Sequence, residues 1–316
     1  MSLADRFCRE RWNLGIVSQS VADIARRGIV TPIQWLPDRN RWEFLADPAC
    51  YSLDGQLVML AEHLDYWNER GEIWAAIVPK AKSNAIAQIA QFRPWLRANF
   101  HLSYPFPFFD GDTLYMICES YQAGGVFLWR KDKDWLLIDK ILDQPAVDAT
   151  IWKGPDRWWL FCGLARDVPN EALYIYHAAR PEGPWFAHVG NPVKRDVASS
   201  RPAGPLFRYD RLLIRPTQDC SQTYGGAITL NVVETLNKEV FSEYPLRQLK
   251  PDRHYHDGLH TICAAGAVTI IDGKYWDTFQ PLDVARKLVV PVRKRLRRFT
   301  KPQWPNSVRD VARENA

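Results

Sequence analysis

The chain has 316 residues, of which 47% are hydrophobic and 24% are charged, and its formal net charge is +5. Much of that charge lies in a basic run between residues 293 and 301, so the remainder is close to neutral and a nucleic-acid-binding surface is not indicated. The six cysteines are scattered and form no Cys-x-x-Cys pair, which argues against structural zinc.

The first expected elements are a strand over residues 13–17 and a short helix over residues 20–27. Short apolar or aromatic runs then alternate with turn sequences, and the 14 Trp, 14 Phe and 12 Tyr suit either pleated sheets or stacking on sugar rings. The expected turns are Asp54-Gly55, Asp110-Gly111-Asp112, Gly154-Pro155-Asp156, Tyr209-Asp210-Arg211 and Asp272-Gly273. A second helix is expected over residues 282–298, interrupted by Pro291.

Successive turns are roughly fifty residues apart, which is the size of a propeller blade. We therefore predict an all-β chain: a five-bladed β-propeller over residues 1–280, with short helical additions near both termini. Residues 281–316 are expected to form a basic tail, helical or partly disordered. Pairing of residues 13–17 with the far end of the chain closes the ring and removes exposed sheet edges. A pair of β-sandwiches is the alternative, which the near-regular spacing disfavours.

Two strand starts are alike, Ala46-Asp47-Pro48 and, about a hundred residues later, Val147-Asp148-Ala149. A lone Asp before a strand is usually a turn residue, whereas a repeated one indicates carboxylates directed at a shared axis, for acid–base work or for binding sugar hydroxyls. In a propeller, the inner strand of each blade begins near the central channel. The corresponding starts in the other three blades contain His101 and Tyr104, Arg201, and His260, which are the expected substrate-binding residues.

With these residues the chain resembles the five-bladed glycosidases of family forty-three and their invertase and levansucrase relatives. The resemblance implies that Asp47 is the general base or nucleophile, that Asp148 orients the substrate and tunes the acid, and that His260 lines the floor of the funnel. Those enzymes carry a general-acid Glu at the start of blade four, where this chain has Arg201. Arginine holds its proton too tightly for that role, but it binds phosphate or carboxylate through two parallel hydrogen bonds.

A more extensive resemblance covers about residues 42 to 280 and rests on many short runs in the same order. It includes the runs at residues 101–106, 115–120, 156–161, 183–185, 188–193, 201–204, 215–220 and 260–261. These runs resemble the N-terminal propeller domain of plant glucosamine inositolphosphorylceramide transferases, whose bacterial relatives stand alone or beside formyltransferase-like domains in neighbourhoods of surface-glycan assembly. In the plant proteins sugar transfer is assigned to a separate C-terminal domain that a chain of this length does not contain, so the resemblance does not carry that activity over.

Further candidate residues lie on the second strands of blades two and four. Glu119 is the candidate general acid if it points into the funnel, and otherwise a hydrogen-bonded structural residue. Arg215, Gln218 and Asp219 are expected to reinforce an anion site around Arg201, and Asp219 is a second candidate acid. The histidines of the strand starts either contact substrate or only satisfy backbone partners.

We predict glycosyl transfer on an anionic sugar, with a sugar or sugar-phosphate substrate, in glycolipid or surface-polysaccharide assembly. The expected catalytic residues are Asp47, Asp148 and Glu119, and no cofactor, metal or nucleic-acid partner is expected. An inverting glycosidase with Glu119 as its acid and a non-catalytic glycan-binding module are the alternatives. The basic tail either contacts anionic lipid or is a solvated terminus. Because no apolar leader follows Met1 and no apolar run is long enough to span a bilayer, we expect a cytoplasmic protein, free or peripheral at the membrane surface.

Overall fold

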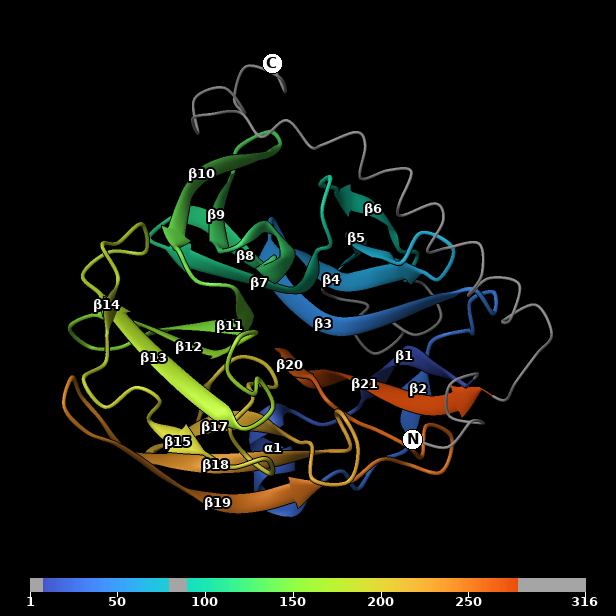
Figure 1. Cartoon of the computed structure of the whole chain (residues 1–316). Helices are drawn as coiled ribbons and strands as arrows, with labels where there is room; N and C mark the ends of the chain where they lie inside the picture. The colour runs from blue at the N-terminus through green and yellow to red at the C-terminus, as the bar shows by residue number, and fades with distance from the viewer. Residues whose placement is uncertain (1–7, 80–89, 278–316) are drawn as a thin grey trace.

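The computed structural model describes residues 8–79 and 90–277, whose strands form five antiparallel sheets around a common centre (Figure 1). Each sheet is one blade of a five-bladed β-propeller, which confirms the predicted fold. Blade one contains β3 (Glu43–Leu53), β4 (Gln56–Asp65), β5 (Arg70–Pro79) and β6 (Arg93–Leu96). Blade two contains β7 (Ser103–Asp110), β8 (Thr113–Glu119), β9 (Val126–Lys131) and β10 (Trp135–Leu142).

Blades three and four continue the same meander. Blade three contains β11 (Ala146–Lys153), β12 (Trp158–Leu164), β13 (Ala172–Ala178) and β14 (Phe186–Ala187), and the short β15 (Lys194–Arg195) also pairs with β13. Blade four contains β16 (Phe207–Tyr209), β17 (Leu212–Asp219), β18 (Ala227–Leu236) and β19 (Phe241–Leu249). A 3-10 turn, η2 (Tyr121–Ala123), follows β8.

Blade five combines strands from the two ends of the described chain. Its sheet order is β2 (Ile33–Trp35), β1 (Arg9–Val17), β21 (Val268–Asp277) and β20 (Ile262–Ala265). The pairing of β1 with β21 runs without interruption from Arg9 opposite Asp277 to Val17 opposite Thr269. The predicted strand over residues 13–17 lies within β1, so the ring closes by hydrogen bonds between the two ends of the described chain inside blade five.

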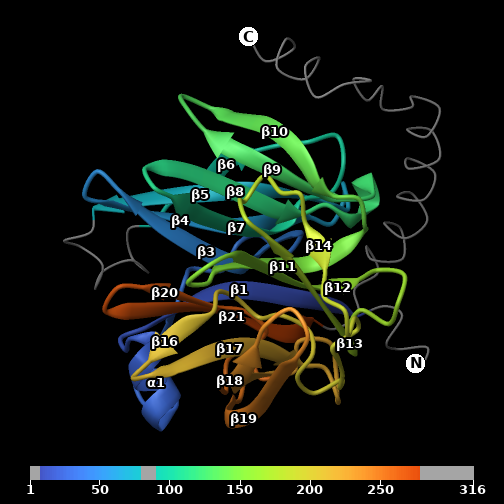
Figure 2. The same cartoon turned by 90° about the vertical axis from the view of Figure 1, so that its left-hand side faces the viewer.

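The N-terminal helix forms where the sequence predicted it, as α1 (Val21–Arg27). Ser20 is its N-cap, because the Ser20 hydroxyl accepts the Asp23 backbone N–H at 3.2 Å. Ile24 and Ala25 are buried and pack against blade four. The helix lies beside this blade (Figure 2). The predicted C-terminal helix and the basic tail lie outside the described residues. No helix of the described part of the chain is long and apolar enough to cross a membrane.

Four of the five predicted turns join strands as expected, and the fifth, Asp272-Gly273, is wrong. Gly266 and Ala267 make the hairpin between β20 and β21, with Gly266 at φ +69°, and Asp272 lies buried inside β21. Asp-Gly is a strong local turn signal. Here Gly273 is needed because a Cβ atom at this position would lie 2.7 Å from Tyr255 Cβ. The glycine after Asp272 is therefore explained by close packing inside a strand and not by a turn.

Apolar side chains pack between neighbouring blades and not around the central axis. Leu60 of blade one packs with Met116 of blade two, and Ile117 of blade two packs with Leu160 of blade three. The interface between blades five and one is built in the same way around Met59. The centre of the ring is thereby left to polar side chains, which must satisfy one another because they are shielded from water.

Candidate active site at the propeller axis

Three inner strands carry the same β-bulge near the centre of the ring. The register of strand pairing jumps between residues 46 and 49 of β3, 103 and 106 of β7, and 147 and 150 of β11. The residues at these bulges, Asp47, Tyr104 and Asp148, have positive φ values of 52°, 44° and 49°. A bulge redirects a side chain, and a non-glycine residue in this conformation costs about 1–3 kcal/mol. The surrounding hydrogen bonds must therefore hold each bulge in place.

Asp47 is buried, and its carboxylate is held from three directions. Its Oδ1 lies 3.2 Å from His260 Nε2 and accepts a hydrogen bond from Thr261 Oγ1, while its Oδ2 accepts the Tyr104 backbone N–H at 3.1 Å. Burial alone raises the pKa of Asp47, but the hydrogen bond and positive charge of His260 outweigh it, so the pKa lies below its usual value. Asp47 is therefore ionised at neutral pH.

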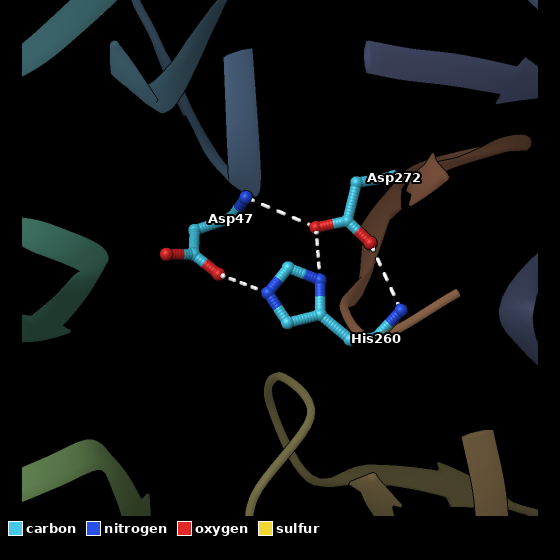
Figure 3. Close-up of side chains that lie close together, drawn as sticks. All are labelled: Asp47, His260 and Asp272. Carbon is cyan, nitrogen blue, oxygen red and sulfur yellow. Dashed lines mark hydrogen bonds and ion pairs between the residues drawn. The ribbon is translucent and has the colours of Figure 1, made fainter. Parts of the chain in front are cut away.

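His260 lies between two carboxylates (Figure 3). Its Nε2 faces Asp47, and its Nδ1 lies 2.7 Å from Asp272 Oδ2 as an ion pair. Asp272 Oδ1 also accepts the His260 backbone N–H at 3.0 Å. Burial lowers the pKa of His260, but the negative charges of Asp272 and Asp47 outweigh burial and hold that pKa well above its usual value. His260 is thus an imidazolium cation shared by two anions.

Asp47, His260 and Asp272 also offer ligand atoms within 4.8 Å of one another, a spacing that a metal ion can use. A histidine ligand must present an unprotonated nitrogen to a metal. Here both ring nitrogens of His260 face carboxylate oxygens, which is the environment of a protonated ring. The chemistry of this group therefore fits an imidazolium between two carboxylates better than it fits a bound metal.

Asp148 forms the other end of the cluster, together with Arg201. Arg201 Nε donates to Asp148 Oδ2, which also accepts from Gln218 Nε2 at 2.8 Å. Arg201 Nη1 donates to Asn170 Oδ1 at 2.7 Å, and its Nη2 has no hydrogen-bond partner among the described residues. Burial lowers the pKa of Arg201, but the charge of Asp148 outweighs burial and raises it above its usual value. The structure thus brings together three predicted site residues, Asp148, Arg201 and Gln218, around a permanent ion pair.

Two further carboxyl groups, Glu119 and Glu62, are buried near this cluster. Glu119 Oε2 accepts the Asp148 backbone N–H at 3.0 Å. Burial, and then the charge of Asp148, raise the pKa of Glu119 to about 8. Burial, and then the charge of Asp47, raise the pKa of Glu62 well above its usual value. Both groups are therefore uncharged at neutral pH, and the predicted acid Glu119 is joined by one that the sequence interpretation missed.

His101 and Tyr104 occupy different positions from those predicted for substrate contacts. Tyr104 gives the site its backbone N–H, whereas its hydroxyl lies 2.9 Å from Thr150 Oγ1 in the packed layer between blades two and three. His101 Nδ1 accepts the Gly71 backbone N–H at 2.9 Å, and its Nε2 lies 3.4 Å from Glu62 Oε1. His101 therefore contacts the cluster through Glu62.

Arg215 and Asp219 do not join Arg201 in an anion site as predicted. Arg215 Nε and Nη2 bind the Glu243 carboxylate at 2.8 and 2.6 Å, and its Nη1 and Nη2 donate to the carbonyls of residues 200 and 199. Asp219 accepts hydrogen bonds from Ser221 and Gln248. Successive residues of a strand face opposite sides, so Arg215 and Asp219 lie on the face of β17 away from Gln218. Their contacts give them a structural role.

An aromatic cover lies over both ends of the cluster. The Tyr224 ring lies 4.8 Å from Arg201 Cζ and 5.5 Å from the His260 ring, and Trp12 packs on His260 with ring centroids 4.0 Å apart. Lys274 Nζ donates to the Tyr224 carbonyl at 2.6 Å and holds this loop down. Sequence reasoning missed Tyr224, Trp12 and Lys274, because each lies in a segment with the pattern of an ordinary strand or loop.

Asp272 is another functional residue that sequence reasoning missed, because it was assigned to a turn. Its Oδ2 accepts the Asp47 backbone N–H at 3.0 Å, and its Oδ1 accepts the Thr261 backbone N–H at 2.9 Å. The apolar run from Val268 to Ile271 leads directly into Asp272 and was a signal that the strand continues. Asp272 therefore connects blade five to the bulge of blade one.

Comparison with known proteins identifies relatives of the chain. Residues 18–257 match the family described as "Glucosamine inositolphosphorylceramide transferase 1, N-terminal". The chain is 30% identical over 253 residues to glucosamine inositolphosphorylceramide transferase 1 of Oryza sativa subsp. japonica, covering 73% of this chain and 33% of that protein. It is 33% identical over 211 residues to the Arabidopsis thaliana protein of the same name, covering 63% of this chain and 27% of that one. The chain thus spans about a third of the length of these relatives.

Among solved structures, the α-L-arabinofuranosidase PaAbf62A of Podospora anserina matches with a TM-score of 0.51 and 10% identity, over 77% of this chain and 95% of that one. At this identity the likeness concerns the fold alone. The match over most of the blades, and the agreement of the propeller with the expected architecture, lead to one assignment. The chain belongs to the family of glucosamine inositolphosphorylceramide transferase 1 N-terminal domains.

Proposed function

We propose that this propeller is carbohydrate-active and catalyses glycosyl transfer in the assembly of glycolipids or surface polysaccharides. The observation that carries the proposal is a single buried cluster in which Asp47 is ionised while Glu119 keeps its proton, with a pKa of about 8. Carboxyl groups whose environments separate their pKa values in this way supply the base and the acid for cleaving a glycosidic bond. Membership in a family named for a glycolipid-forming transferase supports a role in glycolipid assembly, while the transfer chemistry is argued from the cluster alone.

The proton balance of such a transfer assigns a role to each group. An uncharged carboxyl donates its proton to the leaving oxygen as the bond from the anomeric carbon to that oxygen breaks. The acceptor hydroxyl forms the new bond to the anomeric carbon and passes its proton to Asp47. Asp148 accepts hydrogen bonds from sugar hydroxyls, and the unpartnered Nη2 of Arg201 binds an anionic group such as the phosphate of a sugar phosphate.

Binding and turnover on one panel test this proposal. Nucleotide sugars, sugar phosphates and neutral oligosaccharides are screened by thermal shift against wild type, Arg201→Lys and the matched control Arg215→Lys, since both arginines are buried in blade four. We expect phosphorylated sugars to stabilise wild type and the control but not Arg201→Lys. Product formation is then followed for wild type and Asp47→Asn. If Asp47→Asn turns over substrate as fast as wild type, the acid–base proposal is wrong.

A non-catalytic glycan-binding module is the second candidate, favoured by the burial of the cluster and by the use of Arg201 Nε and Nη1 on Asp148 and Asn170. It predicts saturable binding without product, and Asp47→Asn then weakens binding only. Release of free sugar to water, without any acceptor product, points to an inverting glycosidase.

The proposal also includes peripheral contact of the basic residues 293–301 with anionic lipid at the cytoplasmic side of a membrane. Sedimentation with anionic against neutral vesicles tests that contact.

A further inference from the structure

Carboxylates on second strands hold the bulges of the neighbouring blades. Asp272, on β21 of blade five, accepts the backbone N–H of Asp47, the bulge residue of blade one, at 3.0 Å. Glu119, on β8 of blade two, accepts the backbone N–H of Asp148, the bulge residue of blade three, at 3.0 Å. In both cases a buried acid is explained by a structural hydrogen bond that fixes a strained backbone position.

Glu62 breaks this pattern. It lies on β4 opposite Ala46, directly before the bulge of blade one, as Glu119 lies on β8 opposite Ser103, directly before the bulge of blade two. By analogy Glu62 should hold the Tyr104 backbone N–H, but that N–H binds Asp47 Oδ2. Within the described part of the chain, the Glu62 carboxyl accepts no hydrogen bond. Glu62 thus faces His101 Nε2 at 3.4 Å and, unlike Asp272 and Glu119, holds no backbone N–H of a bulge.

The surroundings of Glu62 keep its carboxyl protonated, so that it has a proton to donate. Only 7% of Glu62 is exposed. The charged or titratable groups that act on it are Asp47 of β3, Glu119 of β8, Asp148 of β11, His101 and His260. Burial, and then the charge of Asp47, hold its pKa well above the usual range. An uncharged Glu62 keeps one O–H to donate and fixes no backbone amide, whereas Glu119 is fixed in place by the Asp148 N–H that its Oε2 accepts.

His101 fixes the orientation of this carboxyl group. Its Nδ1 accepts the Gly71 N–H, so the ring proton of the neutral form is on Nε2, which lies 3.4 Å from Glu62 Oε1. Gly71 is required here because a Cβ atom would lie 2.6 Å from Glu62 Oε1. After Glu62 gives up its proton, the Nε2–H of His101 faces the carboxylate that remains and stabilises it without taking up a charge of its own.

We propose that Glu62 is the general acid of the site and that His101 is its positioning residue, an inference that rests on the proposed function. Glu62 transfers its O–H proton to the leaving oxygen while the glycosidic bond breaks, and the acceptor hydroxyl loses its proton to Asp47. One proton leaves Glu62 and one arrives at Asp47 in each transfer, and exchange with solvent resets both groups.

The protonation state of Glu62 can be measured without any substrate. The full chain is labelled with glutamate carrying carbon-13 at the side-chain carboxyl, and the signals of residues 62 and 119 are identified by their loss in Glu62→Gln and Glu119→Gln. We expect the Glu62 signal to remain that of a protonated carboxyl from pH 5 through pH 7. In His101→Phe, which lacks the Nε2–H that stabilises the carboxylate, the signal should titrate at higher pH than in wild type, whereas in the control Glu72→Gln it should titrate as in wild type. A Glu62 signal that titrates below pH 5 in wild type overturns the proposal.

Turnover then tests the role. Dinitrophenyl and methyl glycosides of the sugar that binds best in the thermal-shift panel differ in their need for an acid, because dinitrophenolate leaves without a proton. Glu62→Gln should lose about 10²–10⁴-fold in kcat on the methyl glycoside and far less on the dinitrophenyl glycoside, and should lose the alkaline limb of the pH profile. Glu72→Gln, whose wild-type carboxylate pairs with the exposed Arg97, should match wild type.

The outcomes separate this inference from the proposed function. If Glu62→Gln cleaves the methyl glycoside like wild type while Glu119→Gln does not, Glu119 is the acid, and the proposed function stands while this inference fails. If wild type turns over neither glycoside and produces no acceptor product, the proposed function fails, and the assignment of Glu62 as a general acid fails with it, whatever its protonation state. Loss of activity in Glu62→Gln on both glycosides alike, with a destabilised fold, also overturns a specific acid role.

Discussion

The two ends of the axial cluster neutralise their carboxylates by different means. At one end His260, a titratable cation, lies between Asp47 and Asp272, and at the other Arg201, a permanent cation, binds Asp148. The first end depends on pH because an imidazolium can lose its proton, whereas a guanidinium cannot in the accessible range. Glu62 and Glu119 lie within the field of both ends and stay uncharged. The difference suggests that the His260 end takes part in proton transfer, while the Arg201 end fixes the geometry.

The largest effect is expected from Arg201→Met, which breaks the permanent ion pair. Asp148 then remains buried without its cation, and loss of one partner of a buried pair costs about 3–5 kcal/mol in the free energy of unfolding. Chemical denaturation at neutral pH measures this loss. Because arginine does not titrate and Glu119 keeps its proton below about pH 8, the deficit should be constant between pH 6 and 7.

Two further variants show whether the Arg201 effect is electrostatic. Arg201→Met combined with Asp148→Asn removes both charges and should recover a large part of the lost stability, since no uncompensated charge remains. Arg195→Met breaks a pair with Asp167 in which both side chains are partly exposed, and should change stability little. An Arg201→Met loss no larger than that of Arg195→Met contradicts the assigned ion pair.

A somewhat smaller and pH-dependent effect is expected from His260→Gln. At pH 6 the variant leaves Asp47 and Asp272 without their shared cation, which should cost on the order of 3 kcal/mol. A folded-state pKa above the unfolded one means that the contribution of His260 is complete below about pH 6.5 and is lost as the pH rises through the folded value. The deficit of His260→Gln should therefore shrink as the pH rises, unlike that of Arg201→Met. A deficit that stays constant up to pH 10 contradicts an imidazolium at this end.

How far the sequence predicted these two ends follows from the kind of signal that each residue leaves. Repeated strand starts and regular turn spacing identified the propeller, Asp47 and Asp148, because repetition is visible in one dimension. Asp272 was missed because the local turn preference of Asp-Gly is overruled by the packing of Gly273 inside β21. Arg215 was placed in the site because it lies near Arg201 in sequence, but strand alternation turns it to the other face of β17, where it binds Glu243.

Glu119→Gln should alter stability by less than either cation variant, and in the opposite direction. The folded protein holds the Glu119 proton up to about pH 8, whereas the unfolded chain releases it near pH 4.5, so the wild-type residue lowers stability as the pH rises between these values. Glutamine keeps an oxygen for the Asp148 backbone N–H and carries no charge in either state. The variant should gain roughly 2 kcal/mol relative to wild type at pH 6, about 1.5 pH units above the unfolded pKa, since each such unit costs up to about 1.4 kcal/mol, and nothing at pH 4. Denaturation at both pH values checks this; a variant that is equally destabilised at both would mean that Glu119 is charged.

The smallest effect is expected from Asp219→Asn, which lies outside the comparison of the two ends. Asparagine retains the side-chain oxygen that accepts the Ser221 backbone N–H at 3.0 Å, and the residue lies on the face of β17 away from Gln218. Stability should change by about 0.5 kcal/mol or less, and the thermal shift produced by any sugar of the panel should equal that of wild type. Asp219 was, with Glu119, one of two candidate general acids that the sequence predicted for this site. A loss of sugar binding in Asp219→Asn with an intact fold would place an acid of blade four in the site after all, and the division of the cluster into a His260 end and an Arg201 end would then be incomplete.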